Sequence, residues 1–240
     1  MSEEARRSFH QQLDEIHTEI VRLAGMAVEA VPFGTDVLLA SDLVGADSLI
    51  SRQQEVNRRC LAAEERCYQL IATQAPVAGD LRRIMTAVRM TAEIERAHAL
   101  VVNIAKAARR IYGSPLDPKL RGLITRMSEH AHQLMKFAVD AYVESDAPLA
   151  AALDDMDDML DLLHADFISS IFEVHATGGL ELKVAVQLAV IGRFYERIGD
   201  HAVNIGQRVQ YMVTGAMPLE SGSAGTLSTA DRPLPNAAEF

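Results

Sequence analysis

The chain has 240 residues, enough for one large domain or for two of about 100 to 120 residues each. Its formal charge of −10 argues against nonspecific nucleic-acid binding, because that binding needs a basic surface to displace counterions from phosphates. Two cysteines, an N-terminus without secretory-leader features and no apolar run long enough to span a membrane predict a reduced, soluble, cytoplasmic protein.

Composition and periodicity predict an all-α protein. Tryptophan is absent and aromatic residues make up 5% of the chain, which is untypical of a β-rich fold. Pro32 and Gly34 are expected to kink or interrupt the first helix. Clusters of glycine and proline divide the chain into six expected helices, at 4–40, 42–74, 79–112, 117–144, 147–176 and 180–214.

A repeated segment indicates that the helices form two similar units. Residues 195–205 read YERIGDHAVNI, and residues 94–104, which lie 101 positions earlier, read IERAHALVVNI. An apolar heptad seam surrounds the later copy, and the positions 101 residues earlier carry the same seam with smaller side chains. The later seam is Leu188, Ile191, Tyr195, Ile198, Ala202, Ile205, Val209 and Met212. The earlier seam is Ala87, Met90, Ile94, Ala97, Val101, Ile104, Ala108 and Ile111.

A second alignment relates the middle helices of the two units. Asp42 and Asp146 are 104 positions apart, and each stands where a helix N-cap is expected. We therefore predict two tandem three-helix bundles, related by internal repeat, at 1–113 and 114–216. Residues 217–240 lack periodicity and are expected to form a disordered tail. Cys60 and Cys67 are expected to be small core residues.

Four acidic residues of the second unit predict a metal site. Glu196 and Asp200 lie four apart, and so do Asp157 and Asp161 on the preceding helix, so each pair shares a helical face. If the two helices pack antiparallel, the pairs face each other and form an oxygen-rich site for a hard or borderline cation. A competing interpretation is that Arg193 or Arg197 pairs with Glu196 without any metal.

The acidic residues of the chain are also compatible with two other classes of protein. Glu95-Arg96-Ala97-His98 fits the Glu-x-x-His motif of ferritin-like di-metal oxidases and storage proteins. Gly199 replaces the histidine in the other unit, and each unit has three helices rather than four, so a chance match explains the motif better. A plain structural bundle, with solubilising acids only, is the third interpretation. No recognisable nucleophile motif or glycine-rich phosphate loop is present, so no catalytic residue is assigned and an enzyme is not expected.

Residues 196–205, followed by Tyr211-Met212-Val213-Thr214-Gly215, resemble the signature of the PhoU family of phosphate-uptake regulators. Residues 70–82 resemble that family's turn between its second and third helices. The resemblance covers about residues 8 to 215 and is strongest to actinobacterial members, because of the Phe194-Tyr195-Glu196 lead-in and the long polar tail.

The resemblance implies a cytoplasmic protein of tandem three-helix bundles, expected to be a homodimer. It implies an adaptor between the ATPase subunit of the phosphate ABC transporter and a sensor histidine kinase, which keeps phosphate-starvation genes off when phosphate is sufficient. Association with the membrane is expected only through these partners. The resemblance also implies that acidic pairs bind a divalent or trivalent metal ion: iron, zinc, manganese or magnesium. In this sequence that site maps to Asp157, Asp161, Glu196 and Asp200.

The first unit departs from the family pattern. Gln53 and Asn57 stand where an acidic pair is expected, and Ala99 replaces the last acid, so that only Glu95 remains. Amide oxygens bind divalent metals far more weakly than carboxylates do. We therefore predict that the first bundle has lost its metal site and that one site per chain remains, on the second bundle.

Overall fold

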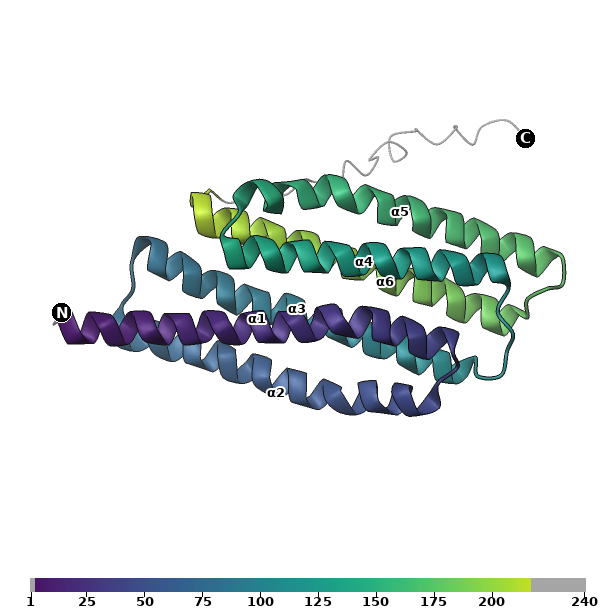
Figure 1. Cartoon of the computed structure of the whole chain (residues 1–240), viewed down its shortest axis with the longest axis horizontal. Coiled ribbons are helices and arrows are strands. Elements are labelled where there is room, and N and C mark those ends of the chain that lie inside the picture. The colour runs from purple at the N-terminus through teal and green to yellow at the C-terminus, as the bar shows by residue number, and fades with distance from the viewer. Residues whose placement is uncertain (1–2, 217–240) are drawn as a thin grey trace, which may run out of the picture.

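The computed structural model describes residues 3–216, which form six long helices and contain no β-strand (Figure 1). Helices α1 to α3 form one bundle, and α4 to α6 form a second bundle beside it, which confirms the predicted architecture. The domain limits set at 113 and 114 stay a prediction, and the tail expected at 217–240 lies outside the described residues. The helices are α1 Glu3–Leu39, α2 Leu43–Gln74, α3 Ala78–Arg110, α4 Pro118–Glu144, α5 Ala147–Ala176 and α6 Leu182–Thr214.

Helices α2 and α5 begin at short acidic side chains. Asp42 accepts hydrogen bonds of 3.0 Å from the backbone N–H groups of Val44 and Gly45, and Asp146 accepts one of 2.9 Å from Leu149. These two contacts confirm both predicted N-caps, since the carboxylate oxygen satisfies backbone donors that have no partner within the helix.

Of the two outcomes expected at Pro32 and Gly34, an interruption does not occur, and a kink stays a prediction. Helix α1 runs through both Pro32 and Gly34, and Pro32 lies on its exposed side. A Cβ atom at Gly34 would come within 2.5 Å of Val101 Cγ1, so glycine at this position allows α1 and α3 to approach closely. The sequence signal at Gly34 therefore reflects packing between helices rather than a break.

The two repeated seams form the cores of their bundles. All sixteen predicted seam positions, on α3 with its C-cap Ile111 and on α6, are buried, and the same core encloses both cysteine side chains. Burial raises the pKa of the Cys60 thiol to about 12 and that of Cys67 to about 11, so both remain protonated core groups at neutral pH.

The bundles pack through α1 against α4 and α3 against α6. Arg82 near the start of α3 donates to the backbone oxygen of Met212 near the end of α6, so these helices run antiparallel. Thr35 of α1 lies 2.7 Å from both Ser128 Oγ and Tyr195 Oη, and these buried hydroxyls join three helices across the interface. Within residues 3–216, no helix combines the length and apolarity needed to cross a membrane.

Candidate functional site

The four predicted acidic residues lie along the groove where α5 and α6 pack antiparallel. Glycines recur every seven residues on this side of α6, at 192, 199 and 206. A Cβ atom at Gly199 would collide with Asp157 Oδ1 and come within 2.7 Å of Leu160, so the missing side chain leaves room for Asp157. The tight packing of α6 on α5 thus brings both acidic pairs into one groove.

Mutual repulsion and burial dominate the electrostatics of this groove. Burial, followed by the charges of Asp161, Asp200 and Glu196, raises the pKa of Asp157 to about 7. Burial and Asp200 also raise the pKa of both Glu196 and Asp161. Asp157, Asp161 and Glu196 therefore each sense charges on the opposite helix, as expected if the two acidic pairs face each other.

Three buried polar atoms of the groove have no hydrogen-bond partner among the described residues: Asp157 Oδ1, Glu196 Oε2 and His164 Nε2. Buried polar atoms in folded proteins nearly always have a partner, so unpartnered atoms such as these point to a water molecule or an ion. Two carboxylate oxygens and an imidazole nitrogen suit a borderline divalent cation in chemical type.

Arg193 supplies part of the missing positive charge. Its guanidinium pairs with Glu196 Oε1 one turn away, so the competing ion pair considered from the sequence does form. Within residues 3–216, no three histidine, cysteine, aspartate or glutamate side chains converge closely enough to hold a metal ion. The unpartnered atoms of Asp157, Glu196 and His164 fit a cation in chemistry and burial, whereas the side chains of Asp161 and Asp200 are exposed.

His164 is not among the ligands predicted from the sequence. An added Cβ atom at Gly192 would lie 3.1 Å from His164 Cδ2, which places the ring between α5 and α6, one turn beyond Asp161. Burial and then Arg193 lower its pKa, which favours the neutral ring. The repeat offered a signal for the position of His164. The equivalent residue of the first bundle, 104 residues earlier, is Cys60, which is buried.

In the equivalent place of the first bundle, uncharged side chains hydrogen-bond to one another. Gln53 Nε2 donates to the Asn57 side chain, and Gln53 Oε1 lies 2.7 Å from His98 Nδ1. His98 stands at the position of Gly199, and Gln53 at that of Asp157. His98 is thus held by an amide rather than by carboxylates, which weakens the di-metal oxidase interpretation of its motif.

A second polar cluster, also missed from the sequence, joins the bundles between α3 and α6. Glu93 Oε2 lies 2.7 Å from His201 Nδ1 and accepts a 3.3 Å hydrogen bond from Asn204. Burial opposes the charge on Glu93, but these bonds prevail and lower its pKa. The repeat does not predict this cluster, because Phe194 and Leu100 occupy the positions equivalent to Glu93 and His201.

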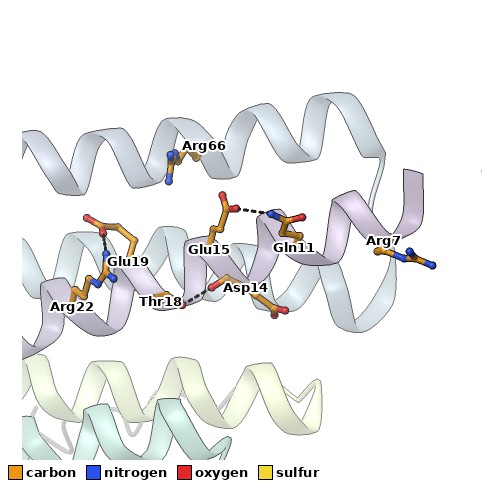
Figure 2. A pocket seen from close by; sticks show the side chains of 8 residues that line it. All are labelled: Arg7, Gln11, Asp14, Glu15, Thr18, Glu19, Arg22 and Arg66. Atoms are coloured by element: carbon orange, nitrogen blue, oxygen red, sulfur yellow. Dashed lines mark hydrogen bonds and ion pairs between the residues drawn. The ribbon is translucent and has the colours of Figure 1, made fainter. Parts of the chain in front are cut away.

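A large open groove of about 670 Å³ lies between α1 and α2 near the N-terminus (Figure 2). Its acids mostly have local partners: Gln11 donates to Glu15 at 3.2 Å, and Arg22 lies 4.0 Å from Glu19. Arg59 also donates to Glu19, at 2.9 Å. Because these groups already have partners within the protein, they do not single out a ligand, and this groove is not assigned a function.

Comparison with known proteins gives the family. The PhoU domain model matches the chain twice, over residues 20–108 and 124–209. The protein named "Phosphate-specific transport system accessory protein PhoU homolog 1" in Mycobacterium leprae (strain TN) is 34% identical over 222 residues, covering 92% of this chain and 99% of that protein. Homolog 2 in Mycobacterium tuberculosis (strain ATCC 25618 / H37Rv) is 36% identical over 214 residues, covering 89% and 100%.

These mycobacterial relatives agree with the expected resemblance to actinobacterial members. The crystal structure of PhoU from Pseudomonas aeruginosa superimposes with a TM-score of 0.82 at 22% identity, covering 87% of this chain and all of that one. At this identity the superposition shows the fold alone. Two domain matches cover most of the chain, and relatives above 30% identity span nearly its whole length, so the chain belongs to the PhoU family.

Proposed function

We propose that this protein regulates phosphate uptake as an accessory protein of a phosphate-specific transport system. The double PhoU domain match carries the proposal, and the relatives' names, which call them accessory proteins of such a system, support it. In this role the protein keeps phosphate-starvation genes off while phosphate is sufficient.

The protein acts as a non-enzymatic cytoplasmic adaptor between the transporter's ATPase subunit and a sensor histidine kinase. Two elongated bundles side by side provide extended helical faces for two partners (Figure 1). The chain works as a homodimer, reaches the membrane only through these partners, and does not bind nucleic acid, in keeping with its charge of −10.

A metal ion binds in the groove between α5 and α6, held by Asp157, Asp161, Glu196 and Asp200. The unpartnered buried oxygens of Asp157 and Glu196 support this assignment, as does the mutual repulsion of the carboxylates. Iron, zinc, manganese and magnesium are the candidate ions. A bound cation supplies the positive charge that Arg193 provides to Glu196 alone.

Gene deletion tests the regulatory role. Cells without this protein should express high-affinity phosphate uptake genes in phosphate-rich medium, measured by transcript levels and phosphate uptake, and plasmid-borne wild-type protein should restore repression. Unchanged expression in the deletion strain would contradict the proposed function.

Elemental analysis tests the metal site. Protein purified without chelator should carry metal that is lost in the double variant Asp157→Ala with Glu196→Ala. The matched control changes the corresponding residues of the first bundle, Gln53→Ala with Glu95→Ala, and should keep its metal. Equal metal content in all three proteins would remove the assignment without affecting the regulatory role.

A further inference from the structure

The outer face of α5 carries a row of exposed apolar side chains. Met156, Met159 and Leu162 follow one another at intervals of three residues and are 37%, 45% and 65% exposed. Residues three apart on a helix are surface neighbours, so these side chains form a continuous apolar stripe. A contiguous apolar stripe on a surface, unlike single exposed apolar residues, points to an interaction site.

The stripe borders a groove between α4 and α5. Leu134 and Phe137 of α4 form its apolar side, and Met156 and Met159 of α5 form the other. Asp155 contributes a carboxylate to the rim of this cavity of about 310 Å³. The groove lies on the side of α5 away from α6, so it does not share its lining residues with the candidate metal groove.

The first bundle shows that the fold does not require this stripe. The positions 104 residues before Met156, Met159 and Leu162 are Arg52, Glu55 and Arg58. Glu55 and Arg58 pair with each other in solvent. The equivalent positions on the middle helix of the first bundle thus accommodate three charged residues, so the exposed apolar residues of α5 are not required by the bundle fold.

The chemistry of the groove indicates its occupant. Methionine side chains are flexible and polarisable, and they accommodate apolar side chains of an incoming helix. Asp154, Asp155 and Asp158 are exposed on α5 around the stripe, whereas Lys136 on the α4 side is paired with Asp140 at 2.9 Å. The uncompensated charge is therefore negative, which attracts a basic partner and repels anionic lipid or a second copy of this acidic chain.

We propose that the groove between α4 and α5 binds an amphipathic helix of a partner protein. Apolar side chains of that helix insert between Phe137 and Met159, and its lysine or arginine residues face Asp155 and Asp158. The inference deepens the proposed adaptor role, on which it rests, by assigning one docking surface and the chemical class of segment that it accepts.

Fluorescence anisotropy with a labelled model peptide of leucine and lysine, designed as an amphipathic helix, tests the groove directly. Replacing Met156, Met159 and Leu162 together by glutamine should weaken binding about tenfold or more, because the apolar contacts carry most of the affinity. Asp155→Asn with Asp158→Asn should also weaken it and reduce its salt dependence. Leu61→Gln, which changes an isolated side chain of 66% exposure on α2, is the matched control and should bind like the wild type.

Several results would overturn the inference. Binding that depends on the aspartates but not on the apolar stripe would indicate nonspecific charge attraction. Loss of the homodimer in the glutamine variant, measured by light scattering, would assign the stripe to a second copy. Loss of binding to anionic vesicles would assign it to a lipid surface. All substituted side chains are exposed, and melting temperatures equal to that of the wild type establish that the variants are folded.

Complementation of the deletion strain separates this inference from the proposed function. The glutamine variant should fail to restore repression, whereas Leu61→Gln should restore it. Full repression by the glutamine variant would show that the adaptor role does not use this groove. If the deletion strain shows no derepression at all, the regulatory role fails, while the peptide measurements still decide whether the groove accepts a helix.

Discussion

His98 Nδ1 lies 2.7 Å from Gln53 Oε1 in the first bundle, at the positions where the second bundle has Gly199 against Asp157. A neutral hydrogen bond thus replaces the contact between a glycine and the half-buried carboxylate of Asp157. Gln53 also donates to the side-chain oxygen of Asn57, so this network contains no carboxylate. This network gives a physical reason why one repeat should hold a cation while the other does not.

Rebuilding the acidic groove in the first bundle should create a second metal site. The change is Gln53→Asp, Asn57→Asp, His98→Gly and Ala99→Asp, which copies the residues of the second bundle. We expect the bound metal to double relative to wild-type protein, measured by elemental analysis after equilibrium dialysis. The variant without the His98→Gly change is the control, because its imidazole still occupies the space beside residue 53. No increase in either variant would show that these positions do not limit metal binding.

Removing one carboxylate from the second bundle should stabilise the metal-free protein. Asp157→Asn relieves repulsion among four acidic groups and replaces a buried carboxylate by a neutral amide. At pH 8 with chelator present, the melting temperature should rise, whereas added divalent metal should stabilise the variant less than the wild type. The control Asp166→Asn, on an exposed part of α5, should change neither quantity. A lower melting temperature of Asp157→Asn in chelator would contradict the repulsive arrangement.

Gly199 should tolerate alanine poorly because of its contact with α5. The added Cβ atom would collide with Asp157 and press on Leu160, so Gly199→Ala is expected to destabilise the protein by about 1 to 3 kcal/mol. Gly122→Ala, in an exposed part of α4 with nothing within 4 Å of the added atom, should instead stabilise it by about 0.5 to 1 kcal/mol. Urea denaturation measures both. Equal effects at the two glycines would contradict the close approach of α5 and α6.

The Glu93 cluster should make the interface between the bundles sensitive to acid. The pKa of Glu93 is lowered in the folded protein, despite burial, by its bonds to His201 and Asn204. The folded state therefore binds the proton less tightly than the unfolded state does. The ionised Glu93 therefore stabilises the folded protein fully above the pKa of glutamate in the unfolded state, near 4.3. This stabilisation is lost as the pH falls through the lower pKa that Glu93 has in the folded state.

Glu93→Gln should lower the free energy of unfolding at pH 7 by about 1.5 to 3 kcal/mol, because it removes a charged acceptor from a buried cluster. The difference from wild type should shrink as the pH falls below about 4.3. Thermal melts between neutral and acidic pH measure both effects, and exposed Glu65→Gln is the control. A difference that is the same at every pH would rule out the ionised Glu93 as its source.

Local sequence patterns already determined the helices, the repeat and the buried seams. Alternating steps of three and four residues place Ile198, Ala202 and Ile205 on one side of α6 whatever that side packs against, and capping by Asp42 and Asp146 needs only backbone groups two or three residues away. The same spacing placed each acidic pair on one helical face. Helix α1 continues through Pro32, although the local preference of proline alone favours a kink or a break there.

Contacts between distant segments were decided only by the tertiary structure. The pairing of Glu93 with His201 spans 108 residues and breaks the repeat, so no periodicity could indicate it. The unpartnered ring nitrogen of His164 and the apolar groove beside Met159 likewise depend on which neighbour each face of α5 meets. Helical periodicity fixes the direction of a side chain about its own axis, whereas its partners depend on how whole helices approach one another.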